Sequence, residues 1–205
     1  MHQGSEIKGG AGHAHKPTSV FDLMSQNINR LPAFDQKIFM YGHVCLAGNA
    51  SIAGLVAHSL FRRSLNVSQA AFTSALPMAV LPYISTYALY AALVSGPLLS
   101  DDLQCGACAV TRGALIGLVG GGLYPILLAL PVNLGLAVRY YTTPMPEKGN
   151  VLRFWMDISR PILKKTRAVL VVQCLFGTFL GHKNFDTYTK LIQLSFPSDG
   201  EELED

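Results

Sequence analysis

The sequence predicts an all-α, polytopic membrane protein, a bundle of about four transmembrane helices with amphipathic helices at the interface. Charged residues are absent from four long blocks, Ile38–Phe61, Ser64–Ser100, Gly113–Val138 and Ala168–His182. Three of these blocks exceed the roughly 20 helical residues that cross a hydrocarbon core of about 30 Å, and the fourth nearly reaches that length. Only 14% of the residues are charged, against about 25% in ordinary soluble domains.

Length and composition narrow the function classes. In a chain of 205 residues, four spans leave no room for a separate catalytic domain. The net charge of +3 is mild, and nucleic-acid binding would need a clustered basic face with stacking aromatics. The 4 cysteines are too few for a disulfide scaffold. We therefore expect no catalytic, cofactor-binding or metal-binding residues, no cofactor, and no nucleic-acid partner.

The ends of the chain differ from its middle. Residues 1–17 are polar and glycine-rich and predict a disordered tail, while residues 196–205 form an acidic tail. The region between, residues 18–195, is expected to be a single four-helix membrane domain. Apolar residues recur at helical spacing over Val20–Leu31 and predict a short amphipathic helix that ends at Pro32 and lies on the membrane surface or on a partner.

Basic residues and one proline delimit the spans. Arginines follow the first span and bracket the third, and Pro161 suits the first helical position of the fourth. Lys164, Lys165 and Arg167 would reach from the first turns of that fourth span to the headgroups. The predicted spans cover residues 39–61, 70–94, 113–138 and 161–181.

The distribution of cations predicts the orientation. The loops after the first and third spans, with their flanks, carry nine of the 16 Lys and Arg residues, and the opposite side carries the other seven. Several of those seven lie far from a span, where they have little influence on topology. The first and third loops are therefore expected on the inner side of the membrane, and both termini on the outer side.

Small residues recur at four-residue spacing in three spans. Such spacing lets neighbouring helices approach closely, and internal packing of the bundle is the favoured interpretation. The alternative is that the small-residue faces of the first and third spans hold the helices of another protein. The Gly/Pro-rich third span also leaves open a small channel or transporter lined by a broken helix. This helix-packing face comprises Ala50, Gly54, Gly113, Gly117, Gly121, Gly177 and Gly181.

Polar residues inside the spans are uncharged. A transporter or proton relay usually keeps an ionisable Asp, Glu, Lys or Arg at membrane depth, and none occurs here. Hydrogen bonding between helices is therefore the expected role of these side chains. They are His43, Asn49, His58, Asn133 and Gln173.

Cys105 and Cys108 form a CxxC pair in the loop between the second and third spans. A dithiol at this spacing can close a disulfide or exchange with other thiols. Zinc would need a second pair of ligands. On the outer side of the membrane a structural or regulatory disulfide is expected in preference to catalysis.

A basic amphipathic helix leads into the fourth span, with Trp155 as an interfacial anchor. Its cations either set the topology or contact anionic lipid or an acidic partner loop, and both readings use the same side chains. The interfacial basic residues are Arg153, Arg160, Lys164, Lys165 and Arg167.

Several stretches of the sequence resemble the transmembrane protein 126 family. The most specific runs from Cys105 to Pro125 and includes the CxxC pair and the glycine-rich segment, and it continues from Pro131 to Tyr140. Leu60–Val67 and Ala75–Ala79 also fit, as do Lys148–Leu152 and Trp155. The similarity covers about residues 20–195, and the CxxC and Pro-Val-Asn runs are closer to the A paralogue than to the B paralogue.

The resemblance implies a multi-pass protein of the mitochondrial inner membrane that helps to assemble respiratory complex I. Its partners would be complex I membrane-arm subunits, other assembly factors and membrane lipid, with cardiolipin as a candidate. The outer side of the membrane, where both termini are expected, would then be the intermembrane space. The family brings no catalytic or cofactor residues to assign.

Overall fold

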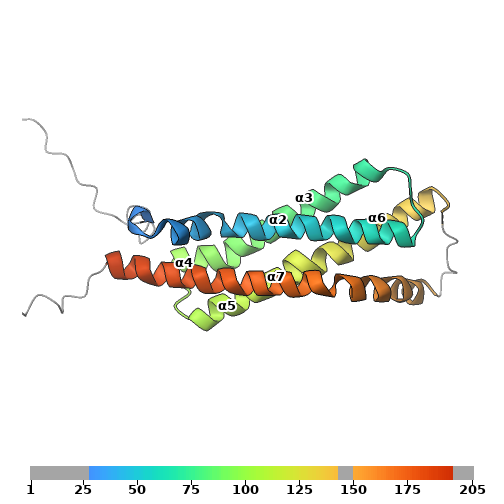
Figure 1. Cartoon of the computed structure of the whole chain (residues 1–205). Coiled ribbons are helices and arrows are strands. Elements are labelled where there is room, and N and C mark those ends of the chain that lie inside the picture. The colour runs from blue at the N-terminus through green and yellow to red at the C-terminus, as the bar shows by residue number, and fades with distance from the viewer. Residues whose placement is uncertain (1–27, 143–149, 196–205) are drawn as a thin grey trace, which may run out of the picture.

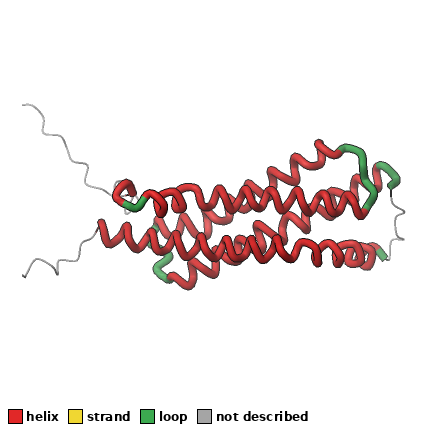
Figure 2. Tube along the Cα trace, viewed as in Figure 1, coloured by secondary structure: helices red, strands yellow, loops and turns green. Residues whose placement is uncertain are grey.

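The computed structural model describes residues 28–142 and 150–195. Figure 2 shows that helices and short loops make up this part of the chain, which contains no strand. The predicted all-α fold class is confirmed. The predicted tails and most of the predicted amphipathic helix before Pro32 lie outside the described residues. Within the described residues, the 3₁₀ turn η1 (Ile28–Arg30) precedes the bundle.

Four long helical rods build the bundle. The first is α2 (Ala33–Ser64). The second is α3 (Ala71–Tyr90), which continues through the π-helical segment η2 (Ala91–Ser95) into α4 (Gly96–Leu99). The third is α5 (Gly106–Leu115), the π-helical segment η3 (Ile116–Leu123) and α6 (Tyr124–Arg139). The fourth is α7 (Val151–Ser195).

The rods alternate in direction, so α2 begins and α7 ends at the same end of the bundle (Figure 1). We call this the terminal end, and the opposite end, where α2 and α6 finish and α7 begins, the basic end. At the centre, α2 packs against α3, α6 and α7, and α5 packs along α7. Each predicted span falls within one rod, except that residue 70 of the second span precedes α3 by one position.

Three rods are long and apolar enough to cross a membrane: Ala33–Ser64, Ala71–Leu99 and Gly106–Arg139. The predicted fourth span, residues 161–181, lies inside α7, and its crossing of the membrane remains a prediction. The helices extend beyond the predicted spans, because charged residues that end a hydrophobic block do not end a helix. In particular, the predicted surface helix and fourth span are one continuous helix of 45 residues.

Three rods end in the same backbone motif. After α2, Asn66 has a positive φ of 52°, and the N–H of Val67 donates to the carbonyl of Arg62 at 3.0 Å. Asp101 after α4 and Tyr141 after α6 repeat this arrangement, with φ values of 60° and 54°. These are Schellman-type caps, which satisfy the last carbonyls of a helix and reverse the chain. Asn and Asp tolerate this conformation better than most residues do.

The two π-helical segments are stabilised by side chains from elsewhere. A π turn displaces the regular hydrogen-bond pattern and leaves carbonyl groups that need other donors. In η2, the carbonyl of Leu93 accepts from Nη1 of Arg112 at 3.1 Å. In η3, the carbonyl of Gly121 accepts from Nε2 of Gln173 at 3.2 Å. The predicted deformability of the Gly-rich third span thus takes the form of an eight-residue π-helical segment that is packed into the bundle.

The surface of the bundle is apolar over much of its length. Large hydrophobic side chains are exposed on every rod, and Phe72 of α3 is 89% exposed. The outer rod that begins with α3 shows more of them than any other rod, including Leu76, Val80 and Ile84. A surface of this kind is unfavourable in water but matches lipid or the helices of other membrane proteins.

Candidate functional site

The small-residue face predicted from the sequence lies between the chain's own helices. Gly113 and Gly117 of the third rod face Gly177 and Gly181 of α7. A methyl group at Gly113 would overlap the carbonyl oxygen of Gly177, and one at Gly117 would lie 3.3 Å from the Cα of Gly177. The two backbones are therefore in direct contact, which only glycine permits at these positions.

The remaining residues of that face also pack against other helices of the same chain. Ala50 is fully buried, and a methyl group at Gly54 would lie 3.1 Å from Cγ of Pro82 in α3. A methyl group at Gly121 would lie 3.2 Å from the amide carbon of Gln173. In this structure the faces have no room for a client helix, so the alternative of a docking face on these residues does not fit.

A buried hydrogen-bond network connects three rods around His58, which is 3% exposed. Nδ2 of Asn133 in α6 donates to Nδ1 of His58 at 2.9 Å. A neutral imidazole whose Nδ1 accepts carries its proton on Nε2, which lies 3.1 Å from Oγ of Ser74 in α3 and donates to it. The Ser74 hydroxyl in turn donates to the carbonyl of Ala70 at 2.7 Å.

The other intramembrane polar residues have different roles. Gln173 bonds to the third rod, as described above. The rings of His43 and Tyr87 are tilted by 54° relative to one another, with their centroids 4.9 Å apart. Asn49 is exposed and has no hydrogen-bond partner among the described residues. Sequence reasoning identified these polar positions, but only the fold shows which of them pair.

An ionic cluster at the terminal end joins α2 to α7. Nζ of Lys190 lies 2.8 Å from Oδ2 of Asp35 and 3.0 Å from Oδ2 of Asp186. Lys183 lies within 3.8 Å of Asp35, which is 6% exposed. Nearby, the hydroxyl of Tyr188 donates to Asp101 of the loop before α5. Sequence reasoning missed this cluster, because its members are far apart in the chain and follow no local pattern.

The predicted thiol pair lies at the terminal end. Cys105 caps α5, where the N–H of Cys108 donates to its Sγ at 3.3 Å. Both thiols are free and exposed. Hydrogen bonds from Cys108 lower the pKa of Cys105 below that of an ordinary thiol. The pair can therefore react with thiol reagents or disulfides from outside, while its closure to a disulfide remains a prediction.

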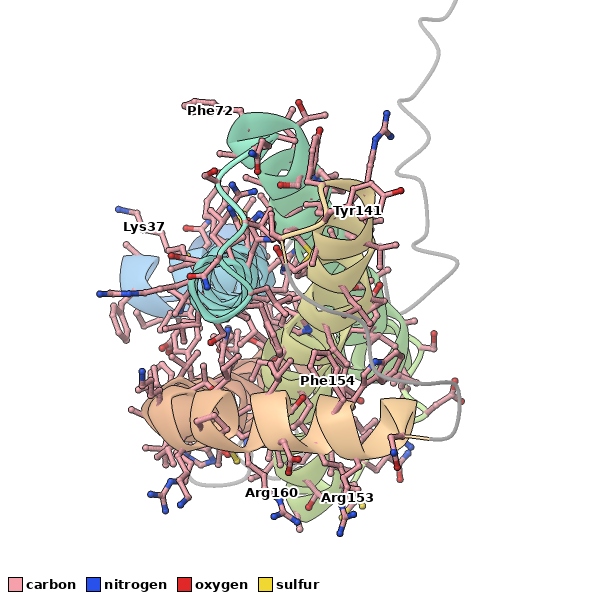
Figure 3. The ribbon with its side chains drawn as sticks, turned by 90° about the vertical axis from the view of Figure 1, so that its right-hand side faces the viewer. Lys37, Phe72, Tyr141, Arg153, Phe154 and Arg160 are labelled. Atoms are coloured by element: carbon pink, nitrogen blue, oxygen red, sulfur yellow. The ribbon has the colours of Figure 1, made fainter. Side chains whose placement is uncertain are left out.

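At the basic end, the first turns of α7 run across the bundle and the helix then turns along it. Figure 3 looks onto this end and shows Arg153 and Arg160 on the side of α7 that faces away from the other helices. Phe154 and Trp155, on the inner side, pack against the buried clusters at this end. Pro161 lies inside this helix and removes one of its hydrogen bonds, which permits a bend.

All five predicted interfacial cations are exposed: Arg153, Arg160, Lys164, Lys165 and Arg167. None of them forms an ion pair with another described residue. Arg62, Arg63 and Arg139 lie at the same end of the bundle, whereas Asp157 is the acidic residue described there. The basic end thus carries a strong positive charge at the level where the helices would leave the bilayer.

The family described as Transmembrane protein 126 matches residues 18–198. Transmembrane protein 126A of Mus musculus is 44% identical over 189 residues, which cover 90% of this chain and 96% of that protein. The Homo sapiens protein of the same name is 43% identical over 174 residues, covering 85% of this chain and 89% of that protein.

A more distant relative carries a functional name. The protein named complex I assembly factor TMEM126B, mitochondrial, of Rattus norvegicus is 31% identical over 165 residues, covering 80% of this chain and 72% of that protein. No solved structure matches the chain. The resemblance predicted from the sequence motifs is confirmed, and the chain belongs to the Transmembrane protein 126 family.

Proposed function

We propose that this chain is an assembly factor for respiratory chain complex I in the mitochondrial inner membrane. It would bind membrane-arm subunits and other assembly factors by helix contact within the bilayer, and would catalyse no reaction. The observation that carries this proposal is its relation to proteins that are named complex I assembly factors. An apolar bundle with a broad exposed surface supports a role in binding other membrane helices.

The outward face of α3 is the surface that best suits a client. In the apolar 18-residue stretch of this rod, 28% is buried inside the bundle. The corresponding share is 44% for α2 and 50% for the third rod. Tyr83 and Tyr87 lie on this exposed face with stacked rings 6.5 Å apart, and neither hydroxyl has a hydrogen-bond partner among the described residues. Polar groups at membrane depth are unfavourable in lipid, and a client helix with a polar side chain would satisfy them.

The difference in charge between the two ends of the bundle supports the orientation that the cation count favours. The basic end would face the matrix, where it can contact anionic lipid such as cardiolipin or acidic loops of partners. The terminal end, with its mixed charges and the thiol pair, would face the intermembrane space. Both termini would lie on that side.

The alternative of a small channel or transporter is less well supported. A pore lined by the third rod would need open space beside its Gly-rich segment. Instead, η3 packs against α7, α2 and α3, and its buried glycines contact neighbouring helices. Solute flux through the purified protein in liposomes would favour this alternative.

Affinity purification from mitochondria in mild detergent, followed by mass spectrometry, tests the assembly proposal. Complex I membrane-arm subunits should co-purify with the chain. A double variant, Tyr83→Phe with Tyr87→Phe, removes only two hydroxyl groups from α3 and should reduce their recovery about tenfold, given about 0.6–2 kcal/mol for each interhelical hydrogen bond. The matched control, Tyr41→Phe with Tyr124→Phe, makes the same change on other rods and should not.

Two outcomes would contradict this proposal. Absence of complex I subunits from the purified material would remove the assembly role. Equal recovery from both double variants would leave the assembly role intact and exclude the face of α3 as the contact.

A further inference from the structure

The pair of helices α2 and α7 forms two hollows that follow one another along the bundle. The first, of about 160 Å³, lies at the basic end. The second, of about 250 Å³, lies deeper, toward the middle of the bundle. Along α2 their lining residues descend from Ser64 to Asn49, and along α7 they ascend from Pro161 to Gln173, so both hollows lie on the same side of the same helix pair.

The outer hollow has the chemistry of an anion site. Arg63 and Ser64 at the end of α2 and Lys165 of α7 line it, and its lining includes no carboxylate. Neither Arg63 nor Lys165 has an ion-pair or hydrogen-bond partner among the described residues. Two unpaired cations on separate helices, with a hydroxyl group beside them, favour a phosphate group.

Pro161 of α7 lines this outer hollow beside the end of α2. The first part of α7 crosses the basic end at an angle to the bundle axis (Figure 3). Ile162, which is 2% exposed, lies at the apolar base of the hollow, and Leu60 adds a second apolar wall. The site therefore changes from charged to apolar in the direction of the membrane interior.

The inner hollow has the chemistry of an acyl-chain groove. Ala53 is a small buried residue between the exposed side chains of Ile52 and Val56 on α2 and Val172 on α7. From Arg63 to Ile52 the helix rises about 16 Å at about 1.5 Å per residue. That rise is close to half of a hydrocarbon core of about 30 Å, so the groove follows the thickness of one leaflet.

We propose that α2 and α7 together bind one anionic glycerophospholipid, with its phosphate between Arg63 and Lys165 and an acyl chain along Ile52, Val56 and Val172. A zwitterionic lipid fits less well, because its cationic headgroup would meet two basic side chains. Charge complementarity at the rim and the continuity of the two hollows select a lipid over a helix of another protein. The proposal rests on the membrane setting of the proposed function and narrows its lipid contact to one site.

Native mass spectrometry of the full chain, purified in mild detergent and titrated with phosphatidylglycerol, cardiolipin or phosphatidylcholine, tests this site. A double variant, Arg63→Gln with Lys165→Gln, should weaken the phosphatidylglycerol and cardiolipin adducts about 25-fold, since each basic residue near an anionic surface contributes a factor of about five. The matched control, Arg160→Gln with Lys164→Gln, removes the same charge from the same end outside the hollow. It should weaken the adducts less than about threefold.

Two further measurements distinguish binding of a whole lipid from binding of phosphate alone. Val172→Trp, which fills the groove at an exposed position, should weaken the adducts while both cations remain. Inorganic phosphate should not displace the lipid, and displacement at equal concentration would assign the site to free phosphate and overturn the proposal. Equal loss of lipid adducts in the double variant and its control would also overturn the proposal. It would show that the lipid is attracted by the overall charge of the basic end and not by this site. These measurements use the purified chain alone. Their outcome is therefore independent of whether complex I subunits co-purify with it.

Discussion

The contact between the third rod and α7 predicts a large effect from a single methyl group. Gly117→Ala adds a Cβ that would overlap the carbonyl oxygen of Gln173 and lie 3.3 Å from the Cα of Gly177. These are backbone atoms of another helix and cannot rotate away. The helices must therefore separate by on the order of 1 Å to recover carbon contacts of about 3.5–4.0 Å.

The cost follows from this separation. Overpacking at a well-packed contact costs about 1–3 kcal/mol. The separation also stretches the bond from Gln173 to the carbonyl of Gly121, now 3.2 Å, and such interhelical bonds contribute about 0.6 kcal/mol on average. Alanine also favours the helix over glycine by about 1 kcal/mol. A control variant with the same Gly→Ala change shares this gain, so the gain cancels in the comparison. We expect a net loss of about 1.5–3.5 kcal/mol relative to that control.

Gly135→Ala is the control, because a Cβ at Gly135 meets nothing within 4 Å. Reversible unfolding of the purified variants in mixed micelles with increasing sodium dodecyl sulfate, followed by circular dichroism, measures the difference in free energy of unfolding. A Gly117→Ala protein as stable as the Gly135→Ala protein would show that the two helices are not in backbone contact, and would refute this packing.

Three other features give predictions of the same kind. His58→Ala removes the link between three rods and should lower the free energy of unfolding by about 1–3 kcal/mol in the same assay. Lys190→Met leaves the carboxylate of Asp35 without its nearest cation and should lower the unfolding midpoint. A membrane-impermeant maleimide should label Cys105 readily at neutral pH, since its lowered pKa increases the thiolate fraction. Cys108→Ala removes one cause of that lowering, so the pKa should rise and the labelling rate at neutral pH should fall.

Each of these predictions has a control or a result that would contradict it. Ser85→Ala removes a hydroxyl that bonds only within α3, so its effect should be smaller than that of His58→Ala. Lys37→Met removes an exposed cation near the start of α2 and should leave the midpoint unchanged. For the thiol, equal labelling rates at neutral pH with and without the Cys108 side chain would contradict the inferred hydrogen bond. Labelling of Cys105 from the matrix side alone would contradict the proposed orientation.

Sequence patterns located the small-residue contacts without showing which surfaces meet. The four-residue spacing of Gly113 and Gly117 indicates a flat helix face, because residues at that spacing share one side of a helix. The same spacing in a partner helix is equally compatible with an external client. Only the packing of the third rod against Gly177 and Gly181 of α7 shows that the face is internal.

The polar network shows a similar division. His58 and Asn133 could be identified as hydrogen-bonding residues, since a polar side chain in an uncharged span needs a partner. Their pairing across 75 positions of the chain has no local signature. The same is true of Asp35 and Lys190, which are 155 positions apart.

By itself, the sequence determined the medium, the helical fold class and the family, because absence of charge over long blocks and specific motifs are local properties of the chain. The tertiary structure decided which faces are occupied and which remain open. Helix pairing depends on contacts between residues distant in sequence, and these also form the two hollows between α2 and α7 and the exposed face of α3.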